Sequence, residues 1–456
     1  MIFGDICVKK SVCSYAVRMI CVLLMLGLIH AYVGVPAGVV GVAEKFSMAY
    51  VFTGNTSTQI SYVEHTNNSL QMVSPSGWFN LNVDGTLQVP ANRSQFVTRM
   101  HEHDIRVVVC LNNHWDQLTG INALNNADFL TTQLAYYVEL YDLDGINVDI
   151  ENITPAQRDL YTKFVALLRE KIPAHKEVSV AVGANPTGTT RGWVGAYDYA
   201  ALSVYVDYFM IMTYDEHYEG GSAGSVSSIS FVEQSIQYAL TKTTRDKIVM
   251  GIPFYGRMWS VENTNISGVA VTNRDIDSIV KTYGGVTTFD VVTQSAKVEF
   301  TVKSEDALLS IQGQRLAVGS YVVWFENAQS IQAKMGLVHR YNIKGVGAWA
   351  LGQEDTSIWN NYASWLNDGG SSGGGSSGGG SSGGGSSGGF SSSSLPSSTT
   401  SVTPKPTEQV GSEVIVELTP PMVEVDSPWS FRIVVLLVGV VLVVVGGVVV
   451  WLQRFR

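Results

Sequence analysis

The chain has 456 residues and a formal net charge of −10 at pH 7. This length allows for about two to three domains. The negative charge disfavours nucleic acid or a wholly anionic polymer as a partner, because like charges repel, whereas a mostly uncharged polysaccharide is compatible with it.

The amino-terminal residues 1–43 have the pattern of an export signal. Basic residues up to Arg18 precede an apolar run from Met19 to about Val42 that ends in small residues. Such a run after a basic region is typical of a secretory signal peptide, with Ala43 as the cleavage point. Because the run is long for a signal core, an uncleaved amino-terminal anchor is the alternative. Both interpretations predict that the chain is exported.

Between residues 46 and 351, apolar strand-like runs alternate with helical stretches, which predicts parallel strands joined by crossover helices. Eight units of about 35 residues predict an α/β fold, a (β/α)8 TIM barrel, whose active site lies at the carboxyl ends of the strands. The strands are expected at Ser47–Phe52, Met72–Phe79, Arg106–Leu111, Gly145–Asp149, Val178–Val182, Tyr208–Thr213, Ile248–Ile252 and Gly345–Ala350.

Residues 257–343 are too long for one crossover connection and contain alternating patterns such as VEFTV and YVVWF. They predict a small α+β insertion between strands seven and eight that forms one wall of a groove. The whole catalytic part is expected within residues 44–367.

The cysteines exclude two kinds of chemistry. Three of them, Cys7, Cys13 and Cys21, lie in the leader, and Cys110 lies alone in an apolar strand. No disulfide can therefore form within the barrel, and thiolates cannot build a metal site there. We expect Cys110 to be a buried small hydrophobe, and no metal or cofactor is predicted.

The carboxyl-terminal part changes composition abruptly. Residues 368–390 repeat Gly and Ser and predict a flexible linker, and residues 391–430 form a Ser/Thr/Pro-rich acidic stalk. Residues 433–452 carry no charge and are long enough to cross a bilayer as a helix. The basic residues in 453–456 predict a short cytoplasmic tail. We therefore expect a single-pass membrane protein at the cell surface, with an extracellular catalytic domain. A lipid-anchor signal is the rival interpretation of this apolar tail.

The segment LDGINVDIE, Leu143 to Glu151, alternates apolar and polar residues. On a strand, Asn147, Asp149 and Glu151 would share one face, because successive side chains point to opposite sides. Carboxylates at i and i+2 lie about 6.6 Å apart at the backbone, close enough to raise each other's pKa. Glu151 is therefore a candidate general acid near neutral pH. An exposed edge strand with solvated acids is the alternative.

The same segment resembles the DGxDxDxE signature of glycoside hydrolase family 18, with Asn147 in place of one Asp. YFMIMTYDEH, IVMGIPFYGRMW and GVGAWALGQED resemble later strands of that family. GAYDY and VVWFENAQSIQAK are similar to the bacterial spore-cortex peptidoglycan N-acetylglucosaminidases. The resemblance covers the chain from about Phe46 to Leu366.

The resemblance implies a site and a mechanism. Glu151 would protonate the leaving oxygen, Asp149 would orient the substrate's acetamido group, and Tyr214 would hydrogen-bond its carbonyl. The implied substrate-binding residues are Asp144, Asn147, Met212, Asp215, Trp349, Tyr255, Asn112 and His114. Asn112 and His114 stand where many chitinases have a Ser-x-Gly-Gly segment.

The implied function is a membrane-anchored glycosidase that hydrolyses β-1,4 bonds of N-acetylglucosamine-containing polysaccharide, peptidoglycan or chitin, by substrate-assisted retaining catalysis. The alternative is a catalytically inactive, chitinase-like lectin that binds such glycans. We expect a monomer whose partners are the polysaccharide and, through residues 433–452, a membrane.

Overall fold

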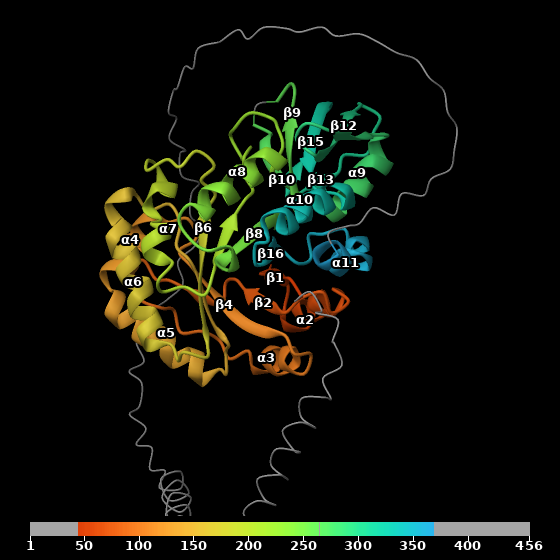
Figure 1. Cartoon of the computed structure of the whole chain (residues 1–456). Coiled ribbons are helices and arrows are strands. Elements are labelled where there is room, and N and C mark those ends of the chain that lie inside the picture. Colours follow the sequence, from red (N-terminus) through yellow and green to blue (C-terminus); the bar gives the residue numbers. More distant parts are fainter. Residues whose placement is uncertain (1–43, 264, 369–456) are drawn as a thin grey trace, which may run out of the picture. The chain divides into compact units, whose positions relative to one another are not determined.

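The computed structural model describes residues 44–263 and 265–368, which form a closed barrel with a small second domain (Figure 1). Eight parallel strands make the ring, in which β1 pairs with β16 and β2 pairs with β4. The predicted (β/α)8 barrel is confirmed. The ring consists of β1 (Phe46–Val51), β2 (Met72–Pro75), β4 (Arg106–Asn112), β5 (Gly145–Asp149), β6 (Glu177–Gly183), β7 (Phe209–Met212), β8 (Ile248–Pro253) and β16 (Gly345–Trp349).

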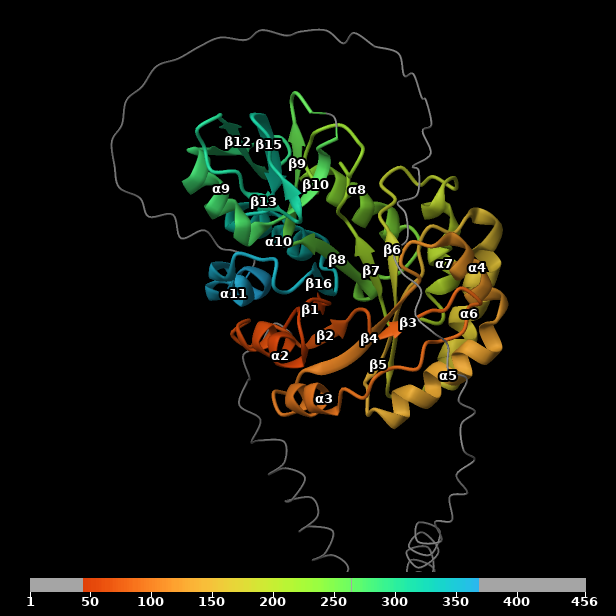
Figure 2. The ribbon, with the colours of Figure 1, turned by 180° about the vertical axis from the view of Figure 1, so that it is seen from behind.

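The helices cover the outside of this ring (Figures 1 and 2). In α6, for example, Tyr161, Phe164, Val165 and Leu168 recur at helical spacing and are buried against the strands. The helices of the barrel are α2 (Thr56–Glu64), α3 (Ser94–His101), α4 (Gln117–Asn125), α5 (Ala127–Leu140), α6 (Arg158–Lys171), α7 (Tyr199–Leu202), α8 (Ile229–Leu240), α10 (Ala328–Tyr341) and α11 (Tyr362–Asn367).

Two apolar clusters cover the two faces of the barrel strands, one on the outer face and one on the inner face. The larger one fills the space between the ring and the helices, and a smaller one, including Met48, Cys110 and Met210, fills the interior of the barrel. Cys110 is fully buried and makes no disulfide, as expected of a small hydrophobe. Polar side chains that point inward above this inner cluster are therefore held in a low-dielectric setting.

A small domain is inserted directly after β8. Its antiparallel sheet has the order β10-β9-β15-β12-β11 and packs one face against α9. Figures 1 and 2 show it as a separate group of strands above β8 and β16. Its elements are β9 (Tyr255–Ser260), β10 (Ser267–Thr272), α9 (Ile276–Tyr283), β11 (Val286–Asp290), β12 (Ser295–Val302), β13 (Ser310–Ile311), β14 (Gln314–Arg315) and β15 (Gly319–Phe325).

Two boundaries differ from the sequence prediction. The small domain extends from Tyr255 to Phe325 rather than over 257–343, because α10 belongs to the barrel and packs beside α8 and β16. The predicted strand Met72–Phe79 is divided into β2 and a separate β3 (Phe79–Asn80), which pairs with the end of β4.

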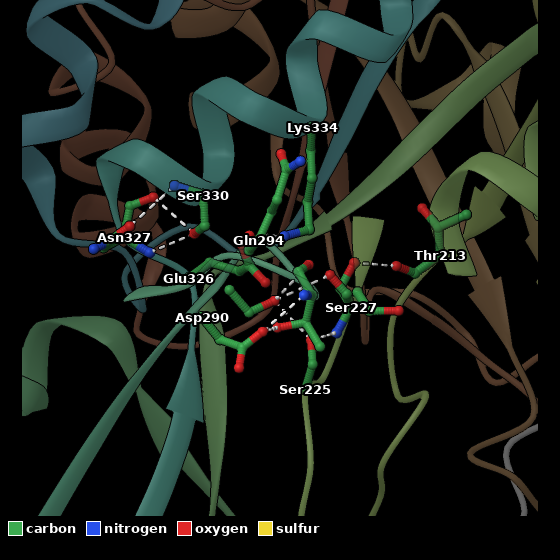
Figure 3. A network of polar contacts seen from close by, with 12 residues as sticks. Thr213, Ser225, Ser227, Asp290, Gln294, Glu326, Asn327, Ser330 and Lys334 are labelled. Atoms are coloured by element: carbon green, nitrogen blue, oxygen red, sulfur yellow. Dashed lines mark hydrogen bonds and ion pairs between the residues drawn. The ribbon is translucent and has the colours of Figure 1, made fainter. Parts of the chain in front are cut away.

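A buried polar network joins the small domain to the barrel (Figure 3). Lys334 on α10 forms a 2.7 Å ion pair with Glu326, and neither side chain is exposed to solvent. The Lys334 ammonium also donates to the backbone oxygen of Gln294, in the turn between β11 and β12.

The network continues into the loop that follows β7 (Figure 3). The hydroxyls of Ser225 and Ser295 lie 2.7 Å apart, and Ser227 Oγ donates to the backbone oxygen of Thr213 at 2.6 Å. The small domain is therefore fastened to the loop that begins at the carboxyl end of β7.

Several predicted segments lie outside the described residues: the leader 1–43 and the linker, stalk, membrane helix and tail between residues 369 and 456. Within residues 44–263 and 265–368, no helix combines the length and apolar character needed to span a bilayer.

Candidate active site

The alternation in β5 places two polar residues inside the barrel. Asn147 and Asp149 point inward, whereas Ile146, Val148 and Ile150 pack in the outer cluster. β5 is paired on both sides, with β4 and β6, and all its residues are buried. The alternative of an exposed edge strand with solvated acids is therefore excluded.

Asp149 has an oxygen ready to accept a hydrogen bond. Its Oδ2 lies 3.7 Å from the Cys110 sulfur, whereas its Oδ1 is buried and has no partner among the described residues. Burial raises the pKa of Asp149 to about 6. A buried acceptor without a partner costs free energy unless a ligand supplies the donor.

Glu151 follows two residues later, just beyond the carboxyl end of β5, and is half-buried. Burial, and then the negative charges of Asp149 and Asp215, raise the pKa of Glu151 well above its usual range. A carboxyl group in this setting retains its proton toward neutral pH, as a general acid must.

Asn113 fixes the backbone at Glu151. Its Oδ1 accepts from the Glu151 N–H and its Nδ2 donates to the Glu151 carbonyl, both at 2.9 Å. The next residue, Asn152, has a left-handed backbone with φ of 56°, so the chain turns sharply away after Glu151. Asn113 was not among the residues predicted from the sequence, where an amide just after the end of the neighbouring strand was the only signal of its positioning role.

Tyr214 and Asp215 come from the end of β7. Burial and the charges of Asp149 and Glu151 raise the pKa of Tyr214 well above its usual range, which places its phenol in the field of both carboxylates. The ring of Tyr214 meets that of Tyr255 edge-on at 6.2 Å.

Asp215 is held by the small domain. Its Oδ1 accepts from Tyr255 Oη at 2.8 Å and from Arg257 Nε at 2.7 Å, and its Oδ2 accepts from Arg257 Nη2 at 3.0 Å. Arg257 was not among the predicted residues, because nothing in its own segment indicates which carboxylate it will reach.

Trp349 ends β16 on the same side of the barrel. Its ring stacks on Phe52 with centroids 5.4 Å apart, and it lies 5.1 Å from the ring of Tyr50. Since Trp349 is only partly buried, part of the indole remains available to an apolar sugar face.

A second aromatic pair lies near Asn152, the residue that follows Glu151. Trp115, 48% exposed, meets Trp193 edge-on at 5.1 Å, and the Asn152 side chain donates to its backbone oxygen at 2.9 Å. The sequence-based prediction did not include this pair, and an aromatic residue three positions after the end of β4 was the only signal.

Two predicted substrate-binding residues do not reach this group. Asp144 lies at the amino end of β5, where Oδ2 is 2.8 Å from His101 Nε2 and accepts from the Val107 N–H. Asn147 is wholly buried, accepting from Tyr50 and donating to Ser179. Asp144 and Asn147 are therefore supporting residues rather than substrate contacts, a correction to the sequence-based assignment.

Three other predicted residues border the group. Asn112 is the register partner of Asp149, and its amide donates to Ser76 at 3.0 Å. His114 Nε2 lies 2.9 Å from Asn80 Oδ1, at the rim beyond β4. Met212 ends β7 on the inward side, in step with Met210.

No group of three or more metal-ligating side chains is arranged to hold an ion in the part of the chain that the structure describes.

Comparison with known proteins gives this site a family. Residues 54–354 match the model for glycosyl hydrolases family 18. The chain is 32% identical over 231 residues to the uncharacterized glycosylase YvbX of Bacillus subtilis (strain 168), covering 50% of this chain and 63% of YvbX. It is 31% identical over 236 residues to the cortical fragment-lytic enzyme of the same organism, covering 50% and 51%. The chain therefore spans about half of one relative's length and less than two thirds of the other's.

Among solved structures, the spore cortex-lytic enzyme SleL of Bacillus cereus superposes with a TM-score of 0.61 at 23% identity, covering 71% of this chain and 74% of SleL. At this identity the likeness shows the shared barrel fold. The family match includes Asp149, Glu151 and Tyr214, and it confirms the resemblance of the sequence motifs. The chain therefore belongs to family 18 of the glycosyl hydrolases.

Proposed function

We propose that the protein hydrolyses β-1,4 bonds in N-acetylglucosamine-containing glycan by substrate-assisted, retaining catalysis. The observation that carries this proposal is the pair formed by Asp149 and Glu151. The buried carboxylate of Asp149 offers an oxygen without a partner among the described residues. The carboxyl group of Glu151, two residues later, has a raised pKa. Substrate-assisted hydrolysis needs one acid and one group that steadies an acetamide, and it needs no carboxylate nucleophile.

In the first step, Glu151 gives its proton to the glycosidic oxygen as the bond to the anomeric carbon breaks. The substrate's own acetamido oxygen attacks that carbon and forms an oxazolinium ion. Asp149 Oδ1 accepts a hydrogen bond from the acetamido N–H and stabilises the positive charge that develops on this group. The Tyr214 hydroxyl donates to the acetamido oxygen from the other side.

In the second step, the Glu151 carboxylate takes a proton from water as the water attacks the anomeric carbon. The ring opens back to the acetamide, and Glu151 is again protonated. Two inversions at the same carbon give net retention. Trp349 supplies the apolar floor beneath the sugar, and Trp115 supplies an exposed ring near the turn that follows Glu151.

Peptidoglycan is our first choice of substrate and chitin the second. The similarity to the cortical fragment-lytic enzyme of Bacillus subtilis supports the first. Asn112 and His114 replace the segment of many chitinases, and their side chains are engaged with Ser76 and Asn80. We also retain the proposal that residues 433–452 hold the enzyme at a cell surface, which rests on the sequence of that segment alone.

The test uses the full chain, incubated separately with peptidoglycan and with N-acetylglucosamine oligomers, and products are identified by mass spectrometry. Glu151→Gln should lower kcat by a factor of about 10²–10⁴, because the amide cannot donate the proton. Glu170→Gln, which changes an exposed glutamate on α6, should leave the rate unchanged. Binding of glycan without cleavage by the unmodified chain would instead support the lectin.

A further inference from the structure

The outer face of the small domain's sheet carries a row of side chains that starts at the proposed site. Arg257 on β9 is the register partner of Trp324 on β15, and Trp324 is in turn the partner of Lys297 on β12. Directly opposite residues on antiparallel strands have their Cβ atoms about 4.5–5.5 Å apart on one face of the sheet. The three side chains are therefore immediate neighbours.

Arg257 connects this row to the catalytic group. Its guanidinium donates to both carboxylate oxygens of Asp215, at 2.7 and 3.0 Å, while the Arg257 side chain is 13% exposed. The Tyr255 hydroxyl donates to the same carboxylate at 2.8 Å. Asp215 itself remains 38% exposed. The row thus begins where the proposed sugar site ends and runs outward from it across the sheet.

The neighbouring part of the sheet is closed to ligands. Trp259, two residues after Arg257 on the same face, is 5% exposed and donates its indole N–H to the backbone oxygen of Gly221 at 2.9 Å. The loop after β7 therefore covers this tryptophan. Trp324 lies one strand farther from that loop and is only partly buried.

Trp324 lies in a shallow depression with the features of a sugar-binding surface. The depression is lined by residues that include Lys297, Glu299, Thr301, Ser320, Val322 and Trp324. Lys297 Nζ lies 5.7 Å from the centre of the Trp324 ring and 3.1 Å from Glu299 Oε1. An aromatic face surrounded by a few hydroxyl, amine and carboxylate groups suits the apolar face and the hydroxyls of a pyranose.

We infer that Trp324 is a stacking platform for a sugar unit of the same glycan chain, several units away from the bond that is cut. The paired charges of Lys297 and Glu299 favour a neutral sugar, and their polar atoms can bond its hydroxyls. This inference rests on the proposed function for the identity of the glycan, but it concerns binding and not hydrolysis. It predicts an enzyme that prefers long chains over short ones.

The test measures binding by calorimetry to the full chain carrying Glu151→Gln, so that ligands stay intact. The probes are the dimer and hexamer of N-acetylglucosamine and a peptidoglycan glycan strand six sugars long. At least one of the two six-sugar probes should bind. Adding Trp324→Ala should raise its Kd about tenfold and should change the Kd of the dimer by less than twofold. Trp324→Phe should restore most of the affinity, because the stacking face is kept.

The control is Val291→Ala, because Val291 is an apolar residue of the same domain that is 78% exposed. This substitution should change neither the affinity for the dimer nor that for the long probe. Equal weakening of dimer and hexamer would overturn the inference, since it would mean that Trp324 acts structurally through Arg257. Unchanged binding of the long probe, or no binding of either long probe, would overturn it as well. If the unmodified chain hydrolyses neither glycan while the variants show the predicted binding pattern, the proposed function is refuted and the sugar platform at Trp324 is still supported.

Discussion

At the scale of single residues, the site depends on two carboxylates whose surroundings differ. Asp149 is enclosed by the barrel, and burial raises its pKa. Glu151 lies at the barrel mouth, where burial and the charge of Asp149 raise the pKa of Glu151. Their protons therefore belong to a coupled pair. This coupling makes the pH dependence of the reaction informative about both residues.

The pH–rate profile should lose activity on its alkaline side as Glu151 gives up its proton. The charge of Asp149 contributes to the raised pKa of Glu151. Asp149→Asn removes that charge, so the pKa of Glu151 should fall and the alkaline limb of kcat/KM should move to lower pH, in addition to a loss of rate. Activity measured from pH 4 to 9 checks this. An alkaline limb that stays in place, or moves upward, would contradict the coupling.

The same raised pKa has a consequence for stability. A carboxyl group whose pKa is higher in the folded state stabilises the fold below its unfolded pKa, and this contribution is lost as pH rises through the folded pKa. Glu151→Gln cannot ionise, so it should avoid the loss and raise Tm at pH 8 by about 1–3 °C, with no gain at pH 4. Thermal unfolding at the two pH values decides; a gain of equal size at both would show that ionisation is not the cause.

Asn113 should act by positioning Glu151. Asn113→Ala removes both side-chain contacts to the Glu151 backbone. A shift of the acid by about 1 Å can cost roughly a hundredfold in rate, so kcat should fall tenfold to a hundredfold with little change in KM. Asn125→Ala on α4, whose side chain is exposed, is the matched control. An equal fall in kcat for both variants would indicate a general effect on folding.

At the scale of elements, sequence periodicity located every strand of the ring, because the apolar runs are long enough to be distinctive. It also placed Asp149 and Glu151 on one face, since side chains alternate along a strand. The family resemblance, by contrast, implied a substrate contact for Asp144, which belongs to the same motif but lies at the amino end of β5. A motif gives the order of residues along the chain. The start and end of the strand decide whether each residue lies at the carboxyl end, where the site is, or at the amino end.

The small domain illustrates a second limit. Its carboxyl boundary was predicted too late because α10 follows β15 after a short link, and an amphipathic helix does not show which domain it packs against. Arg257, Asn113 and Trp324 were also not predicted as parts of the site or its surroundings. Their roles depend on contacts between strands or loops far apart in sequence, which no local pattern encodes.

The buried ion pair of Glu326 and Lys334 should hold these elements together. Burial raises the pKa of Glu326, and Lys334 partly offsets this effect. Lys334→Met leaves an unpaired buried carboxylate and should lower the free energy of unfolding by about 3–5 kcal/mol, whereas Glu326→Leu combined with Lys334→Met should cost much less. Urea titration measures both.

An exposed ion pair provides the comparison for that experiment. Arg99 and Glu64 are 2.7 Å apart, with side chains 42% and 37% exposed. Arg99→Met should cost no more than about 1 kcal/mol. If Lys334→Met costs as little as this, the buried pair does not fasten the small domain to the barrel.

At the scale of the whole molecule, the barrel brings residues from different strands to one end, and the small domain completes that end from above β8. Asp149 and Glu151 come from one strand, Tyr214 and Asp215 from another, and Trp349 from the last. Arg257 then fixes Asp215 from the small domain. The proposed chemistry therefore requires the two domains together, and the proposed glycan platform extends along the second.

The stereochemistry of the first product tests the central claim most directly. Proton NMR of the unmodified chain acting on the glycan that it cleaves reports the anomer formed before mutarotation. Substrate-assisted catalysis by Glu151 and Asp149 predicts the β-anomer first, because two inversions retain the configuration. Initial formation of the α-anomer would mean a single displacement by water, and would contradict the mechanism proposed for this pair.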